Sequence, residues 1–175
     1  MSKHIERIRK LETNQKLFSE NSIDAIWVLD AETLRFEYIT KSIEKISGFR
    51  ADEYINRSIL DRLTTPSIKK ISNLLKEELP KFEKGIENSR AVEVQLSHSN
   101  GTKYWVVIKA KFFKEPDGKR KILGVTREIS ELKRLKLQNK RLAKRIERMS
   151  SDYEKLFKEN ETLKHLIPIC SKCNK

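Results

Sequence analysis

A strand-like segment runs directly into a long helical segment in GVTREISELKRL, residues 124–135. Up to Arg127 the segment has a glycine and two β-branched residues without helical spacing. From Ile129 the leucines recur at helical intervals, with no glycine or proline between them. The chain therefore has to fold into a sheet whose last strand leads into a helix without a flexible linker.

The helical segment carries an apolar heptad repeat that starts at Leu132 and keeps its phase over five heptads. Apolar a and d positions sustained over this length predict a coiled coil, because an isolated helix does not need so narrow a stripe. The predicted interface residues are Leu132, Leu135, Asn139, Leu142, Ile146, Met149, Tyr153, Leu156, Asn160, Leu163 and Ile167.

The two asparagines at a positions, Asn139 and Asn160, predict the orientation of this coiled coil. Two facing asparagines hydrogen-bond each other only in matched register, which favours a parallel dimer. Glu131 and Glu159 would face lysines of the partner helix at the g and e positions, and each such pair contributes little.

Upstream of the junction, periodicity predicts helices and strands in a mixed order. An amphipathic helix is expected over residues 3–19, a strand pair over 24–30 and 34–40, and several short helices over 42–63. A longer helix is expected from an N-cap at Thr65 until Pro80. Three strands are expected over 91–99, 103–113 and 121–129, the first turn being of type I′ because it contains Asn100-Gly101. This order predicts an α+β fold with helices on one face of an antiparallel sheet.

Composition and charge narrow the class of protein. Charged residues make up 36% of the chain and apolar residues 37%, which indicates that part of it is solvated on most sides. The chain has a net charge of +13, of which residues 131–175 contribute +7, from 13 Lys and Arg against 6 Asp and Glu. The apolar runs are too short for a membrane span and the N-terminus lacks a signal-peptide core, so we expect a cytoplasmic protein without a membrane partner.

Four segments together resemble the PAS family of sensory domains, over roughly residues 11–130: LFSENSIDAIWVLD, GFRADEYINRSILD, NGTKYWVVIKAKFF and GVTREISELKRL. The resemblance implies a five-stranded antiparallel sheet with short helices packed across one face. Many members of the family bind a small molecule between helices and sheet, and others are empty dimerising or relay modules. The last strand of the family often ends in Asp-(Ala/Ile/Val)-(Thr/Ser) before a signalling helix. Glu128, Ile129 and Ser130 occupy that place, with Glu instead of Asp, so the resemblance implies that they relay a signal. The alternative is that Ser130 caps the helix and Glu128 is solvated.

If the domain holds a ligand, inward-facing apolar residues should line its pocket. We predict Ile26, Val28, Ile46, Phe49, Leu60, Ile71, Leu75, Val94, Ile108 and Val125. Each of these residues, like Trp27 and Trp105, would equally serve an ordinary core.

No cofactor can be named from the sequence. The domain has no cysteine for a flavin adduct, and residues 42–83 contain no His, Cys or Met to bind haem. Cys170 and Cys173 have half the ligands of a zinc site, which two parallel tails or His165 could complete, although free thiols at the chain end are the simpler interpretation. No phosphate loop, nucleophile motif or phosphoacceptor histidine is present, so we predict no enzymatic activity.

A rival interpretation is a DNA-binding dimer that uses the basic helix over residues 133–148, as in basic-zipper proteins. The basic residues are Lys133, Arg134, Lys136, Lys140, Arg141, Lys144, Arg145 and Arg148. The heptad continues through these residues, so a solvated coiled-coil surface explains them better and a nucleic-acid partner is not our first expectation.

The sequence therefore predicts a cytoplasmic, bacterial PAS module of signal transduction that forms a homodimer, with two-component signalling as its setting. Its domains are an N-terminal amphipathic helix (1–20), a PAS domain (21–130), a parallel coiled-coil helix (131–167) and a cysteine-containing tail (168–175). An unidentified small-molecule ligand and a downstream signalling domain or partner protein are its expected partners.

Overall fold

The computed structural model describes residues 22–166, with side chains as far as residue 163. The chain divides into two compact units, with the boundary between Ser130 and Glu131. The helix predicted over residues 3–19 and the tail over 168–175 lie outside the described residues.

Five antiparallel strands form one sheet in the first unit. They are β1 (Ala25–Asp30), β2 (Phe36–Ile39), β3 (Arg90–Ser97), β4 (Lys103–Lys114) and β5 (Arg120–Glu128). The spatial order is β2-β1-β5-β4-β3, so the last strand of the chain lies at the centre of the sheet. The predicted α+β fold with a five-stranded antiparallel sheet is confirmed.

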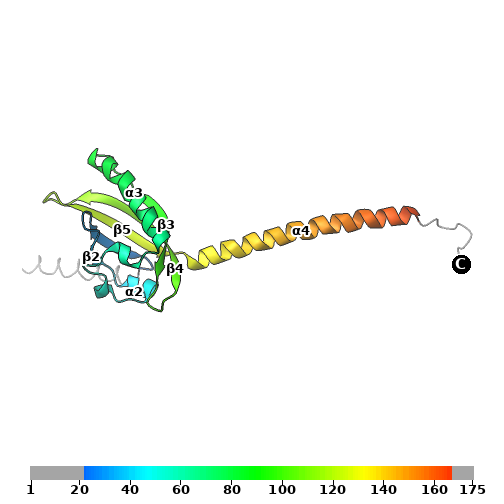
Figure 1. The fold of residues 1–175 in the computed structure, drawn as a ribbon, viewed down its shortest axis with the longest axis horizontal. Coiled ribbons are helices and arrows are strands. Elements are labelled where there is room, and N and C mark those ends of the chain that lie inside the picture. Colours follow the sequence, from blue (N-terminus) through cyan, green and yellow to red (C-terminus); the bar gives the residue numbers. More distant parts are fainter. Residues whose placement is uncertain (1–21, 167–175) are drawn as a thin grey trace, which may run out of the picture. The chain divides into compact units, whose positions relative to one another are not determined.

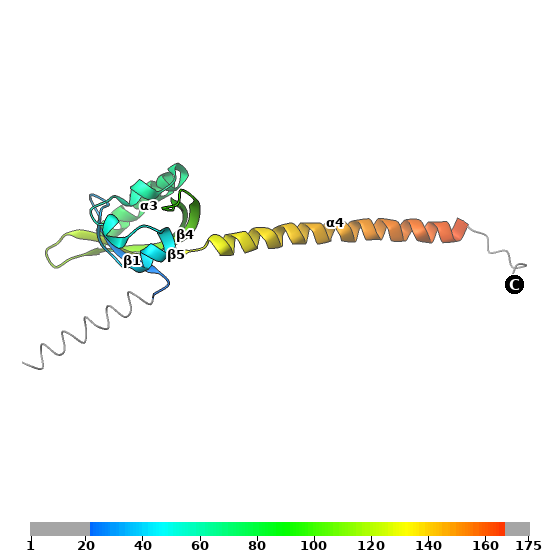
Figure 2. The same ribbon diagram turned by 90° about the horizontal axis from the view of Figure 1, so that it is seen from below.

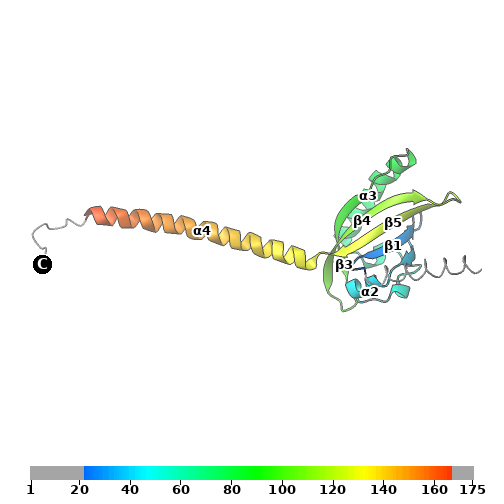
Figure 3. The same cartoon turned by 180° about the vertical axis from the view of Figure 1, so that it is seen from behind.

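The described helices of this unit lie on one face of the sheet. They are α2 (Ser42–Ser47), α3 (Thr65–Glu83) and two short 3₁₀ helices, η1 (Ala51–Glu53) and η2 (Ile59–Arg62). Figure 1 shows α3 crossing in front of the strands, and Figure 3 shows the sheet from its other side. Each strand therefore has an inner face toward these helices and an outer face.

The β3–β4 hairpin forms as predicted, but its turn is not of type I′. Only Gly101 has a positive φ, of 82°, whereas a type I′ turn needs positive φ at both central residues. The loop is longer than two residues, because the amide of His98 donates to the carbonyl of Thr102 and the amide of Gly101 donates to that of His98. The hairpin therefore needs a left-handed residue only at Gly101.

Helix α3 begins one residue earlier than predicted, with Thr64 at its N-cap, and passes through Pro80 to end at Glu83. Proline removes one intrahelical hydrogen bond, so the sequence alone favoured an end at that point. The last turn is held by a tertiary contact, because the ring of Phe82 stacks on that of Phe112 with centroids 5.5 Å apart. Packing thus overrides the local preference.

The core fills the space between the inner face of the sheet and the helices. Alternate strand residues enter it, as in β1, where Ala25, Trp27 and Leu29 are buried. Tyr104, Val106 and Ile108 of β4 do the same. This core determines where a ligand site could be.

Helix α4 (Ser130–Leu166) starts at the last residue of the first unit and forms the described part of the second; it contains no Pro or Gly and runs without a break (Figure 2). With about 1.5 Å of rise per residue, its 37 residues extend about 55 Å.

Candidate functional site

The predicted pocket residues separate into two groups in the structure. Val94 and Ile108 lie on the inner face and are buried, and Ile46 and Ile71 are buried on the helical side. Phe49, Leu60 and Leu75 are partly buried and pack against the same core. These seven residues surround the sheet–helix interface, and only some of them line a cavity.

Three predicted pocket residues, Ile26, Val28 and Val125, lie on the outer face instead. Ile26 pairs with Val125 across β1 and β5, whereas Trp27 pairs with Gly124 and faces inward. Successive strand residues point to opposite faces, so an assignment wrong by one residue reverses the whole strand. The prediction for these three residues was wrong.

Two small cavities lie between the sheet and the helices. The first, of about 30 Å³, is here called the Arg62 cavity, and the second, of about 40 Å³ beside α3, the α3 cavity. The Arg62 cavity is lined by Trp27, Phe36, Ile39, Ile43, Tyr54, Ser58, Ile59, Arg62, Leu96, Ile108 and Thr126. The α3 cavity is lined by Trp27, Leu29, Leu34, Ile59, Ile71, Leu74, Leu75, Arg90, Val92, Ile108 and Ile122. Of the predicted pocket residues, only Ile71, Leu75 and Ile108 line either one.

The indole of Trp27 separates the two cavities, together with Ile59 and Ile108, which also line both. Its Nε1 donates a buried 2.8 Å hydrogen bond to Oγ1 of Thr126 on β5. A Cβ on Gly124 would lie 2.2 Å from the indole ring, so the ring occupies the space that a larger residue would fill. Gly124 and Thr126 thus fix the position of Trp27.

Arg62 is the lining residue that the Arg62 cavity shares with a depression of the surface. The Cζ atom of Arg62 lies 3.3 Å from the ring centroid of Phe49 and 4.6 Å from that of Tyr54. Arg62 also lines an open surface depression, here called the outer hollow, with Asp52, Glu53, Ile55, Arg57 and Asp61. Arg62 is therefore the residue between the interior and the solvent.

Two tyrosines place hydroxyl groups in the core near this cavity. Burial raises the pKa of both Tyr54 and Tyr104, so both hydroxyls stay neutral. The Tyr104 hydroxyl is buried and has no hydrogen-bond partner among the described residues. The interior near Arg62 thus offers neutral polar groups and no buried carboxylate.

The junction between β5 and α4 is hydrogen-bonded to the neighbouring strand. The amide of Ile129 donates to the carbonyl of Trp105 at 2.8 Å, and the amide of Trp105 donates to Oγ of Ser130 at 2.9 Å. Ile129 is buried. The Glu128 side chain is exposed and forms no hydrogen bond or ion pair with any residue in the described part of the chain. Two of the three predicted relay residues are therefore anchored, whereas Glu128 is solvated.

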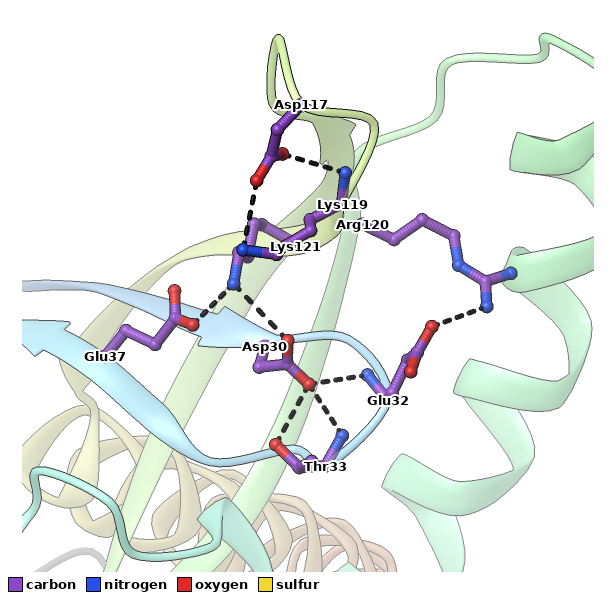
Figure 4. A network of polar contacts seen from close by, with 8 residues as sticks. All are labelled: Asp30, Glu32, Thr33, Glu37, Asp117, Lys119, Arg120 and Lys121. Carbon is purple, nitrogen blue, oxygen red and sulfur yellow. Dashed lines mark hydrogen bonds and ion pairs between the residues drawn. The ribbon is translucent and has the colours of Figure 1, made fainter.

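A network of hydrogen bonds and ion pairs surrounds Asp30, at the end of β1, and Lys121, at the start of β5 (Figure 4). The Lys121 side chain is only 4% exposed, and its Nζ donates to Glu37 and, at 3.3 Å, to Asp30. Asp30 also accepts from the amide of Thr33 at 2.8 Å, which, with its other contacts, lowers the pKa of Asp30 to about 2. Arg120 bonds Glu32 at 3.1 Å and Glu83 of α3 at 2.7 Å. These contacts join β1, β2, β5 and α3 and serve a structural role.

The heptad positions of α4 form an exposed apolar stripe. Its large apolar residues at a and d positions are between 44% and 70% exposed: Leu132, Leu135, Leu142, Ile146, Met149, Tyr153, Leu156 and Leu163. Asn139 and Asn160 are also exposed, and Ile167 lies outside the described residues. A stripe of this kind is available for a partner helix.

The basic residues over 133–148 lie on the same helix, where all except the half-buried Lys133 are exposed. The heptad continues through them, as the exposed Leu135 and Leu142 show. The helix therefore presents its basic residues alongside the apolar stripe, and no separate basic region precedes that stripe.

The structure gives no support to a metal site within the residues it describes, since no three His, Cys, Asp or Glu side chains there are grouped to hold an ion. His98 is half-buried beside the β3–β4 turn, with its ring 5.8 Å from that of Tyr104. Cys170, Cys173 and His165 fall outside the side chains described.

The sequence did not predict the position of Arg62 or the space beside Gly124 that holds the indole of Trp27. Arg62 was one charged residue among many, and only the fold places it over Phe49 and Tyr54. A weak signal was available for Gly124, because a glycine inside a strand often marks a place where another group approaches closely.

Comparison with known proteins gives one consistent result. The family model described as PAS fold matches residues 16–129. No curated protein matches the chain. No helix in the described residues combines the length and apolar character needed to cross a bilayer.

Among solved structures, the chain is similar to the PAS domain of an HTR-like protein from Haloarcula marismortui, with 19% identity and a TM-score of 0.61 over 74% of this chain and 100% of that one. It is also similar to a PAS domain from Colwellia psychrerythraea, with 20% identity and a TM-score of 0.55 over 69% and 98% of the two chains. A PAS domain from a two-component sensor histidine kinase gives 12% identity and a TM-score of 0.51, again over 69% and 98%. Similarity at these identities shows the fold alone.

Proposed function

Because the chain belongs to the PAS family, we propose that it is a dimeric signal-transduction module that senses a small molecule or relays a signal from its last strand into a parallel coiled coil. The observation that carries this proposal is the junction. Only Ile129 lies between the end of β5 at Glu128 and the start of α4 at Ser130.

The junction supports a relay because no flexible linker separates β5 from α4. Ile129 is buried and Ser130 accepts a hydrogen bond from β4, so a shift in the central strands would displace Ser130, the first residue of α4. A ligand produces such a shift only through different affinities for the two states.

The exposed stripe of α4 supports the dimer. Leucines, Ile146 and Met149 at heptad positions are about half exposed or more in the single chain, and a second copy in parallel register would cover them. Asn139 and Asn160 would then face their own copies. We also propose, from the sequence alone, that the helix predicted over residues 3–19 takes part in the dimer.

In this proposal the module has no catalytic activity, resides in the cytoplasm of a bacterium and acts on a downstream domain or partner protein, as in two-component signalling. The basic-zipper alternative is less favoured, because the heptad runs through residues 133–148 without a preceding basic region. Binding of random duplex DNA that is substantial at low salt and lost at moderate salt would favour that alternative.

The test is the oligomeric state of the purified chain and of variants in the stripe. Leu142→Asp and Leu156→Asp, singly and together, should convert a dimer into a monomer in light scattering and native mass spectrometry, because a charge at a d position cannot be buried. Lys144→Asp and Lys158→Asp, at outward f positions, should leave the dimer intact. A dimer that persists in the double d-position variant would refute the coiled coil as the assembly element.

A further inference from the structure

The two cavities of the domain each have an arginine in their lining, and the two arginines differ in their partners. In the α3 cavity, Nε of Arg90 lies 3.0 Å from Oε1 of Glu78, whose side chain is only 7% exposed. In the Arg62 cavity, the side chain of Arg62 forms no hydrogen bond or ion pair with any residue of the described chain, although the residue is half-buried. Arg90 thus has a carboxylate partner inside the domain, whereas Arg62 is bonded to none of the described carboxylates.

The three carboxylates that line the outer hollow with Arg62 each have another hydrogen-bond partner. In the outer hollow, Asp52 pairs with Arg50 at 2.6 Å and Glu53 accepts from the amide of Arg50 at 2.7 Å. Asp61 accepts from the amide of Ser58 at 3.3 Å. The guanidinium of Arg62 instead rests against an aromatic ring, which holds its plane and leaves its N–H edges for a planar anion.

Behind Arg62 the Arg62 cavity is mostly apolar. Its polar lining groups are few, and the Oγ atoms of Thr126 and Ser58 already accept hydrogen bonds, from Trp27 and from the amide of Leu60. A volume of about 30 Å³ is room for about two water molecules, or for a chain of about two or three carbon atoms. The site therefore combines a guanidinium that is bonded to no carboxylate of the described chain with a short apolar interior.

We propose that this site binds a short aliphatic monocarboxylate, with the carboxylate on Arg62 and the alkyl tail in the Arg62 cavity. The inference rests on the proposed function, because it gives a ligand class to a module proposed to sense a small molecule. The tail would contact Trp27 and Thr126, and Thr126 lies three residues before Ile129 on β5. Occupation of the cavity would thus act on the strand that enters α4.

The experiment uses the full chain with sodium propionate and sodium butyrate as probes. Each is titrated while the midpoint of thermal unfolding and the fluorescence of Trp27 are measured, the latter in a Trp105→Phe variant so that one indole reports. Propionamide at equal concentration and sodium chloride at equal ionic strength are the controls. The carboxylates should raise the unfolding midpoint and change the Trp27 emission in a saturable manner, because a ligand specific to the folded state stabilises it. The two controls should do neither.

Variants at two arginines of the outer hollow locate the site. Arg62→Gln should weaken carboxylate binding about tenfold or more, the value of one charged hydrogen bond. Arg62→Lys should have an intermediate effect, because lysine keeps the charge without the planar fork. Arg57→Gln is the matched control and should bind as the wild type does, since Arg57 lines the outer hollow but not the cavity.

Absence of saturable binding by either carboxylate would overturn the proposal, as would equal binding by Arg62→Gln, or stronger binding of sodium benzoate than of propionate. Light scattering on the same samples separates this inference from the proposed function. A dimer that ignores carboxylates refutes the ligand class and leaves the relay, whereas a monomer that binds them refutes the dimeric module and leaves the site.

Discussion

At the scale of single residues, Trp27 determines how the interior of the domain is divided. It is 3% exposed, lines both cavities and donates to Thr126 across the sheet. Its edge-to-face contact with Phe36, with centroids 5.9 Å apart, fixes the ring on its other side. The indole position therefore depends on the absence of a side chain at Gly124.

Gly124→Ala should destabilise the domain by about 1–3 kcal/mol, the usual cost of overpacking a filled core. The added Cβ would lie 2.2 Å from the indole of Trp27, and neither strand can retreat without breaking the β1–β5 ladder. Urea unfolding followed by circular dichroism measures the change. In a Trp27→Leu background the same substitution should cost much less, and an equal cost in both backgrounds would show that the indole is not the obstacle.

Asp30 should contribute to stability at neutral pH and lose that contribution in acid. Its pKa is lowered from 3.8 to about 2, first by the amide of Thr33, so the folded state binds the proton less readily than the unfolded state. The contribution is present above about 3.8 and disappears as the pH falls toward about 2. Asp30→Asn should therefore flatten the acid limb of a urea-unfolding series over that range. Glu115→Gln also removes one negative charge, but the Glu115 side chain forms no hydrogen bond or ion pair among the described residues, so this variant should leave the limb unchanged.

At the scale of elements, the positions of the strands could be predicted from the sequence. Which face of β1 points toward the helices could not. Aromatic and β-branched residues identified all five strands to within about two residues at each end. In β1, however, both alternating sets are apolar, Ala25, Trp27 and Leu29 on one face and Ile26 and Val28 on the other. Period-2 alternation selects a face only when one set is polar. The cavity lining was missed for the same reason, because it depends on which set faces the helices.

The junction is the element boundary with the clearest predicted role. Ser130→Ala should cost about 1 kcal/mol, because it removes the oxygen that accepts from the amide of Trp105. Hydrogen exchange at that amide should become faster, which separates a local effect from a change in global stability. Ser130→Thr keeps the acceptor and should exchange as the wild type does. Unchanged exchange in Ser130→Ala would mean that this contact does not anchor the start of α4.

At the scale of the whole molecule, the heptad repeat predicts a contact between two copies of α4, which lies beyond a single chain. Continuous helix from Ser130 to Leu166 agrees with the predicted segment, and the apolar positions are exposed. Charge is uneven along the helix, with eight Lys and Arg against two Asp and Glu over residues 131–148. Side-by-side parallel copies would bring these basic halves together, whereas antiparallel copies would separate them. The asparagine positions therefore favour the parallel orientation, and the charge distribution favours the antiparallel one.

Oxidative cross-linking distinguishes the two orientations. In a Cys170→Ser, Cys173→Ser background, Leu142→Cys places one thiol at a d position. In a parallel, in-register dimer the two introduced cysteines face each other and should form an interchain disulfide rapidly under mild oxidation. In an antiparallel pair of α4 helices, the same thiol meets its copy only if residue 142 lies at the midpoint of the overlapping segment. Since the heptads extend much further beyond Leu142 than before it, a fully overlapped antiparallel pair keeps these thiols apart.

Lys144→Cys is the control, because position f points away from the seam and should cross-link slowly in either orientation. Leu156→Cys, two heptads further along, tests register and should cross-link as fast as Leu142→Cys when the helices are parallel. Efficient cross-linking at both d positions and not at the f position would support the parallel orientation, which the asparagines favour and the charge distribution opposes. A dimer that cross-links at neither d position would be antiparallel or out of register. It would then lack the matched pair of strand-to-helix junctions on which a symmetric relay from β5 depends.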